Sequence, residues 1–247
     1  MAQSIPQPEQ QRAPRSYWWL EPLATSVVFS LWVLFSLWEI FFHTQGRFGN
    51  YLAPYFSPDV AAWLHVDWFP ALWVAWVPLL FRATCYYYRR EYYRAFFWDP
   101  PACAVNERIK NYRGETSPPT SWAYLHRFFL YLSIVVVVFL WADAVAGFDF
   151  NGHFGVGIGS LVLLVDAILL SLYTFSCHAF RHLVGGDMNC MSCPNGQPRA
   201  RYRVWQWVTT MNRRHGLFAW LSMFWVTGTE LYVRFLILGN IHMVRFF

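Results

Sequence analysis

Two histidines four residues apart, His178 and His182, stand at the end of a long apolar stretch and directly follow Cys177. On a helix, residues at this spacing share one face, so both imidazoles can reach one metal centre. Two cysteines from elsewhere would complete the two-thiolate, two-imidazole ligand set of a Rieske-type [2Fe–2S] centre. The structural alternative is that a histidine at a helix end caps carbonyl groups and a small cysteine packs.

More cysteines and histidines fall at the matching ends of other apolar stretches. Cys85 ends the second stretch, Cys103 follows it in a loop, His126 opens the third and His215 opens the fifth. If these ends share one side of a membrane, four helices bring thiols and imidazoles to one depth. We therefore predict that four ligands come from a set of five residues, the choice staying open: Cys85, Cys103, Cys177, His178 and His182.

Haem b is the rival cofactor, because two imidazoles that face each other across a helical bundle can ligate its iron. His126 opposite His178 or His182 would allow one haem. A second thiol pair, Cys190 and Cys193, forms a CxxC in a turn-rich loop, which by itself supplies only two ligands. We interpret that loop as solvated and leave the pair outside the predicted site.

The elements that would position these residues are five apolar stretches, each near the 20 or so residues that a helix needs to cross hydrocarbon. They cover residues 22–43, 67–84, 124–147, 157–178 and 215–238, and the second contains two prolines. Of the 247 residues 56% are hydrophobic and 13% charged, too few polar side chains to cover a soluble globule. We predict an all-α integral membrane protein: a flexible tail over residues 1–21 and one transmembrane domain of about five helices over residues 22–247.

Lys and Arg concentrate in two of the connections, residues 82–127 and 181–214, while the connections near residues 47–67 and 148–155 hold one Arg between them. The positive-inside rule then places the N-terminus and the histidine-bearing helix ends in the cytoplasm, in a multi-pass protein of the cell membrane. Thiols stay reduced there, so disulfides are not expected. Because the basic residues lie between apolar stretches and not on one face, the net charge of +5 indicates topology and not nucleic-acid binding.

Acidic residues within the apolar stretches cost free energy unless they are paired or hydrated, so each is a functional candidate. Asp143 and Asp166 lie on two consecutive predicted helices and are candidates for a proton path. Glu39 lies near the end of the first helix. Glu230 has Arg234 four residues further on, which predicts an ion pair on one helical face.

Three long segments carry a family resemblance: LLFRATCYYYRREYYRAFFWDPPACAV, SLYTFSCHAFRHLVGG and LFAWLSMFWVTGTELYVRF. They resemble the single-chain, five-helix membrane anchor of actinobacterial succinate dehydrogenase, as found in mycobacteria. The resemblance runs from about Phe48 to the end of the chain. It implies partner flavoprotein and iron–sulfur subunits on the cytoplasmic side, a quinone site near the iron–sulfur subunit, and in some members a Rieske-type arrangement in place of haem.

On this resemblance we expect the chain to anchor a succinate dehydrogenase in the lipid bilayer and to pass electrons to (mena)quinone, as a subunit with no complete activity alone. Quinone reduction needs aromatic contacts to the ring and hydrogen-bond donors to its carbonyls. Six residues stand at the predicted depth: Tyr88, Trp122, His126, Arg127, Arg181 and His215. The alternatives are a haem b subunit of this or another respiratory complex, and a non-redox scaffold or transporter.

Overall fold

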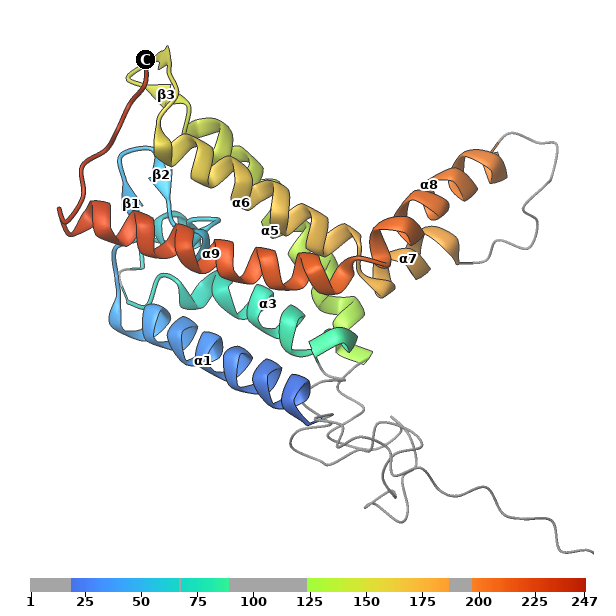
Figure 1. Ribbon diagram of the computed structural model, residues 1–247. Coiled ribbons are helices and arrows are strands. Elements are labelled where there is room, and N and C mark those ends of the chain that lie inside the picture. Colours follow the sequence, from blue (N-terminus) through green and yellow to red (C-terminus); the bar gives the residue numbers. More distant parts are fainter. Residues whose placement is uncertain (1–18, 67, 89–123, 187–196) are drawn as a thin grey trace, which may run out of the picture.

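A computed structural model describes residues 19–66, 68–88, 124–186 and 197–247. Figure 1 shows elongated helices that run alternately up and down a bundle. They are α1 (Leu20–Phe42), α3 (Leu72–Ala83), α5 (Leu125–Ala146), α6 (Ile158–Phe175) and α9 (His215–Ile237). We call the end at which α3 stops and α9 starts the histidine end, and the opposite end the hairpin end.

Two antiparallel β-hairpins mark the hairpin end (Figure 1). One pairs β1 (Arg47–Phe48) with β2 (Tyr51–Leu52), and the other pairs β3 (Asp149–Phe150) with β4 (His153–Phe154). The C-terminal residues join the second hairpin, because Gly157 and Arg245 form an antiparallel bridge. The first hairpin continues into the 3₁₀ helix η1 (Pro54–Phe56) and the short helix α2 (Val60–Leu64).

Most predicted helices match the structure closely, since their ends follow the ends of the apolar stretches. The predicted helix over residues 67–84 is the exception, because α3 starts only at Leu72, two residues after Pro70. Its 12 residues span roughly 18 Å, less than the 30 Å or so of bilayer hydrocarbon. Residues 86–88 add a further helical turn after a break at Thr84 and Cys85. The predicted tail, residues 1–21, falls largely outside the described residues and overlaps the first turn of α1.

Three of the described helices, α1, α5 and α6, are long and apolar enough to cross a membrane. Their outward faces remain apolar: Leu31 and Leu34 of α1 and Val138 of α5 are each at least 60% exposed. An exposed apolar surface this extensive is stable against lipid, where every helix also satisfies its own backbone polar groups. The ring of helices thus faces lipid on its outside.

The core consists of two clusters along the bundle axis. The cluster toward the hairpin end includes Tyr51, Leu52, Tyr55 and Phe56, so the connection after α1 packs inside the bundle. The cluster toward the histidine end contains both described cysteines, Cys85 and Cys177, among aromatic side chains. α6 packs against both α5 and α9, which makes it the central helix of this arrangement.

Candidate functional site

The described residues at the histidine end surround a cavity of about 1160 Å³, which we call the histidine-end cavity. The residues after α3, the first turns of α5 and α9, and the start of α7 (His178–Gly185) form its walls. Five residues of the predicted site line it: Cys85, His126, Arg127, His178 and His215. The predicted meeting of thiols and imidazoles at one end of the bundle is therefore present in the structure.

Among the described residues, one close thiol–imidazole pair joins α9 to the residues after α3. Cys85 Sγ and His215 Nε2 lie 3.4 Å apart, and both side chains are buried. The other ring nitrogen of His215, Nδ1, hydrogen bonds with Ser176 Oγ at 2.8 Å, and the imidazole stacks on Tyr173. Contacts at both nitrogens and on the ring face fix the orientation of the imidazole, as outer-sphere contacts do for histidines that bind metals.

Cys177 lies at a break between two helices that we did not predict from the sequence. We predicted one helix over residues 157–178, but α6 ends at Phe175, and Cys177 has extended backbone and caps the N-terminus of α7. Its Sγ accepts a hydrogen bond from the backbone N–H of Phe180 at 3.2 Å. The prediction that Cys177, His178 and His182 all end the fourth long helix is thus wrong, because both histidines belong to a separate short helix.

Burial keeps both thiols protonated in the protein without a bound metal. It raises the pKa of the Cys177 thiol to about 12 and also raises that of Cys85. For Cys85, hydrogen bonds from the Tyr173 side chain and from backbone groups oppose this effect in part. A buried thiol in apolar surroundings is inert toward ordinary reagents, and a metal centre lowers its pKa by stabilising the thiolate.

The pair His178 and His182 has the predicted geometry. Both lie on α7, and their Nε2 atoms are 3.0 Å apart. Burial lowers the pKa of His178, and the charges of His182 and Arg181 lower it further. His178 is therefore biased toward the neutral imidazole, which is the form that ligates metals.

Among the described residues, no group of three or more His, Cys, Asp or Glu side chains is placed to hold a metal ion. Cys103 falls outside them. In donor chemistry the set still fits a [2Fe–2S] centre with mixed ligands, since Cys85, Cys177, His178 and His215 gather at one end of the bundle. In this structure Cys85 pairs with His215 and His178 pairs with His182, while Cys177 accepts from the backbone of Phe180, so these donors do not converge on one point.

Comparisons with known proteins identify the family. Residues 20–239 match the family described as actinobacterial succinate dehydrogenase subunit SdhC. The chain belongs to this family. It is also similar to a solved chain of the Mycobacterium smegmatis Sdh1 complex in the apo form, with a TM-score of 0.83 and 31% sequence identity. The similarity covers 98% of this chain and 96% of that one. No curated protein matches the chain.

The predicted resemblance is thereby confirmed, and the chain is a membrane subunit of a succinate dehydrogenase. Its apolar, membrane-length helices and its family make it a multi-pass protein of the cell membrane.

The remaining predicted quinone contacts are divided between the cavity and its surroundings. His126 stacks on Phe81 at 4.6 Å, and its Nδ1 lies 3.1 Å from Thr84 Oγ1. Arg127 lines the cavity. Arg181 lies beside it, where Nε donates to Thr209 Oγ1 and the guanidinium packs on Trp205. Trp122 falls outside the described residues, as do Cys190 and Cys193.

Tyr88 does not line the cavity. It is fully buried, and its hydroxyl donates to the carbonyl oxygen of Ala219 at 2.7 Å. Its neighbour Tyr87 lines the cavity instead, together with Trp220, whose Nε1 donates to the Tyr87 hydroxyl at 3.0 Å. Sequence reasoning missed both residues, although their Tyr and Trp character beside Cys85 and His215 is the kind of signal that marks a quinone contact.

The contacts of the acidic residues within the helices differ from those predicted from spacing along the chain. Arg234 Nη2 donates to Glu39 Oε2 at 2.7 Å, and no ion pair joins Arg234 to Glu230 among the described residues. The predicted pair between Glu230 and Arg234 is therefore wrong. Asp143 accepts a hydrogen bond from Ser57 at the hairpin end, and Asp166 is buried in α6.

Proposed function

We propose that this subunit receives electrons from a partner iron–sulfur subunit at the histidine end and passes them to quinone in the histidine-end cavity. The observation that carries the proposal is the gathering of Cys85, His178 and His215 around a cavity of about 1160 Å³ in a member of this family. A cavity of this size holds a quinone ring with part of its tail. Succinate oxidation would take place at a flavoprotein partner, because one helical bundle offers no room for that chemistry.

Membrane orientation follows from the same end of the molecule. We infer that the histidine end and the N-terminus face the cytoplasm, since the connections rich in Lys and Arg join the helices there. Soluble flavoprotein and iron–sulfur subunits would dock on this side. That the similar Mycobacterium smegmatis chain comes from a complex supports the presence of partners.

We propose that Cys85 and Cys177 hold a Rieske-type [2Fe–2S] centre together with two imidazoles from His178, His182 and His215. Imidazole ligands raise the reduction potential of such a centre toward that of quinones, so it would supply one-electron transfer at the cavity wall. The hydrogen bond between His215 Nδ1 and Ser176 Oγ leaves Nε2 directed at Cys85 and the ligand set. Cys103 remains a candidate ligand on the sequence alone.

The quinone contacts proposed here come from residues that line the cavity. The rings of Tyr87 and Trp220 offer flat apolar contact to a quinone ring, while Arg127 and His126 supply N–H donors close to the same wall. A donor at each quinone carbonyl stabilises the negative charge that develops on reduction. This geometry gives the protein a role in orienting the quinone and in supplying protons to its oxygens.

Purification of the tagged chain from its native membrane, followed by electron paramagnetic resonance and optical spectroscopy, tests this function. We expect flavoprotein and iron–sulfur subunits to copurify, and the reduced complex to give a Rieske-type signal without haem bands. Sharp haem bands in the reduced-minus-oxidised spectrum would replace the iron–sulfur centre by haem b, with His126 and His178 as first candidate ligands. Absence of both partner subunits would refute the proposal and favour a non-redox scaffold or transporter.

A further inference from the structure

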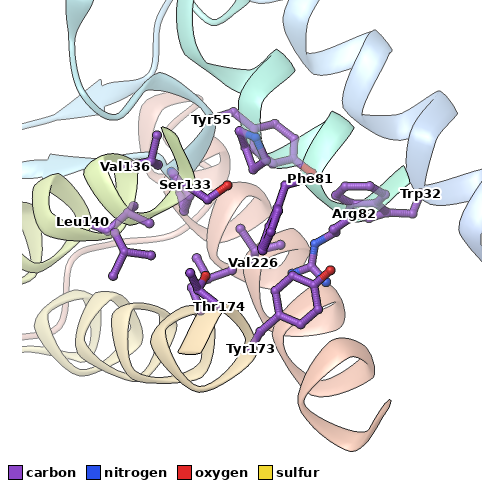
Figure 2. A pocket seen from close by; sticks show the side chains of 14 residues that line it. Trp32, Tyr55, Phe81, Arg82, Ser133, Val136, Leu140, Tyr173, Thr174 and Val226 are labelled. Carbon is purple, nitrogen blue, oxygen red and sulfur yellow. The ribbon is translucent and has the colours of Figure 1, made fainter. Parts of the chain in front are cut away.

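A second, smaller cavity lies in the middle of the bundle, away from the histidine-end cavity (Figure 2). Its volume is about 40 Å³. One buried water molecule needs about 10–15 Å³, so the space suffices for about three. We call it the central cavity, and its walls come from α1, η1, α3, α5, α6 and α9.

Water stays in a buried cavity only where polar groups hold it. Arg82, Tyr55 and Ser133 reach the central cavity from three separate elements, and Figure 2 shows the Ser133 hydroxyl among the apolar lining side chains. Ser133 Oγ is buried and has no hydrogen-bond partner among the described residues. Because buried polar groups in proteins nearly always have hydrogen-bond partners, we expect this hydroxyl to bind a water molecule.

Two carboxyl groups stand one helical turn beyond the cavity, toward the hairpin end. Asp166 precedes the lining residue Leu170 by four positions on α6, and Glu230 follows the lining residue Val226 by four positions on α9. Asp166 is 1% exposed, and neither of its oxygens has a hydrogen-bond partner among the described residues. A buried carboxyl without a partner costs several kcal/mol, so hydration is the physical remedy.

Tyr55 connects Glu230 to the central cavity. The backbone N–H of Tyr55 donates to Glu230 Oε2 at 3.1 Å, while the Tyr55 side chain lines the cavity and its hydroxyl lies 2.8 Å from Ser36 Oγ. The second oxygen of Glu230, Oε1, has no partner among the described residues. Glu230 therefore lies directly behind the cavity wall, and its Oε1 is available to accept a hydrogen bond from water.

One turn of α9 beyond Glu230, toward the hairpin end, Arg234 belongs to a second polar cluster. Glu39, on α1, binds Arg234 and also lies 3.3 Å from His43 Nδ1. The side chain of His43 is 20% exposed, whereas that of Glu39 is fully buried. Arg234 Nη1 further donates to the carbonyl oxygen of Gln45, in the connection after α1. His43 thus places a titratable group between solvent and the buried carboxyls.

On the side toward the histidine end, Arg82 lines the central cavity. The guanidinium lies 4.4 Å from the ring centroid of Tyr173 and 5.4 Å from that of Trp32, as Figure 2 illustrates. Tyr173 in turn stacks on His215 at 5.0 Å. No carboxylate pairs with Arg82 among the described residues; its guanidinium donates to the carbonyl oxygen of Ala219 and to Ser222 Oγ.

We propose that water in the central cavity links Asp166 and Glu230 to the Arg82 and Tyr173 side of the bundle, as the middle section of a proton path from the hairpin end to the histidine end. This inference rests on the proposed function. Reduction of one quinone to quinol takes two electrons, supplied by succinate through the partner subunits, and two protons, which would come through this path from the side opposite the cytoplasm.

The experiment uses the native complex in sealed membrane vesicles that hold a membrane potential. Protons that move inward along the path are driven by the membrane potential. Collapse of the potential with a protonophore should therefore slow succinate-driven quinone reduction by at least about threefold in the wild type. Succinate oxidation by a soluble dye, which bypasses the quinone, should not change.

Two variants and a matched control assign the effect to the central cavity. Ser133→Leu fills the cavity and Asp166→Asn removes a carboxyl, and both should lower succinate-driven quinone reduction to the rate of the protonophore-treated wild type, with no further slowing by the protonophore. Ser171→Leu is the control, because Ser171 lies on α6 outside the cavity lining and should leave the effect unchanged. Should Ser133→Leu fail to assemble, Asp166→Asn gives the answer alone.

The outcomes separate the two proposals. Wild-type complex that reduces quinone with succinate but shows no response to the protonophore overturns the proton path and leaves the proposed function intact. The proton path is overturned in the same way if Ser133→Leu and Asp166→Asn respond like the wild type. Wild-type complex without any succinate-driven quinone reduction overturns the proposed function itself.

Discussion

Cys85 Sγ and His215 Nε2 lie 3.4 Å apart, although 130 positions separate the two residues in the chain. The contact fixes the residues after α3 against the first turn of α9, and it places a thiol and an imidazole at one depth. The pairing also brings His215 into the candidate ligand set, where sequence reasoning had assigned it to the quinone. The histidine end is thus defined by a contact between distant parts of the chain.

Replacement of Cys85 by serine should remove the iron–sulfur signal that we predict for this subunit. Serine keeps the size of the side chain but lacks a soft thiolate ligand, so the centre should not assemble. Electron paramagnetic resonance of the reduced, purified complex measures this directly. Cys190→Ser is the matched control and should keep the signal; a normal signal in Cys85→Ser would exclude Cys85 as a ligand.

Replacement of Arg234 by leucine should destabilise the subunit strongly, because it leaves Glu39 buried without its cation. Loss of one partner of a buried ion pair costs about 3–5 kcal/mol. The midpoint of thermal inactivation in detergent measures the effect. Glu230→Gln is the control, since Glu230 makes no ion pair with Arg234 in the described structure and glutamine still accepts the hydrogen bond from Tyr55. Equal losses in both variants would contradict this pairing.

The helices could be predicted because their signal is local. Each apolar stretch is continuous, and a continuous apolar helix is stable in the bilayer independently of its contacts with the rest of the chain. The two errors in the helices have local causes of another kind. Pro70 delays the start of α3, and the break at Cys177 occurs within SLYTFSCHAF, which contains neither Pro nor Gly. No pattern in that segment distinguishes a break from a continuous helix.

The sequence predicts which residues gather at the candidate site, but not which of them contact one another. Helices that cross the bilayer in alternating directions place Cys85, His126, His178 and His215 at one end, which follows from the order of the apolar stretches along the chain. The partner of each residue depends on how the helices rotate about their axes. The spacing of Glu230 and Arg234 predicted an ion pair, yet Arg234 turns toward Glu39, 195 positions away. The burial of Tyr51–Phe56 inside the bundle could likewise not be predicted from the sequence, which indicated only a connection between two helices.

Gly159 should not tolerate alanine. A Cβ atom at this position would lie 2.5 Å from the ring of Tyr51, which is itself buried and cannot move away freely. We expect a loss of about 1–3 kcal/mol from overpacking. Gly228→Ala is the matched control on α9, because a Cβ there meets nothing within 4 Å. Thermal unfolding of both variants in detergent measures the difference, and similar midpoints would contradict the packing of the first hairpin against α6.

The most direct test of the account compares two activities of the purified complex after replacement of His178 by alanine. His178 lines the histidine-end cavity and neighbours Cys177, whereas His153, in β4, is exposed at the hairpin end and provides the matched control. We predict that His178→Ala loses succinate-driven quinone reduction but keeps succinate oxidation by a soluble dye, and that His153→Ala keeps both. Full quinone reduction in His178→Ala would contradict the claim that electrons reach quinone at the histidine end.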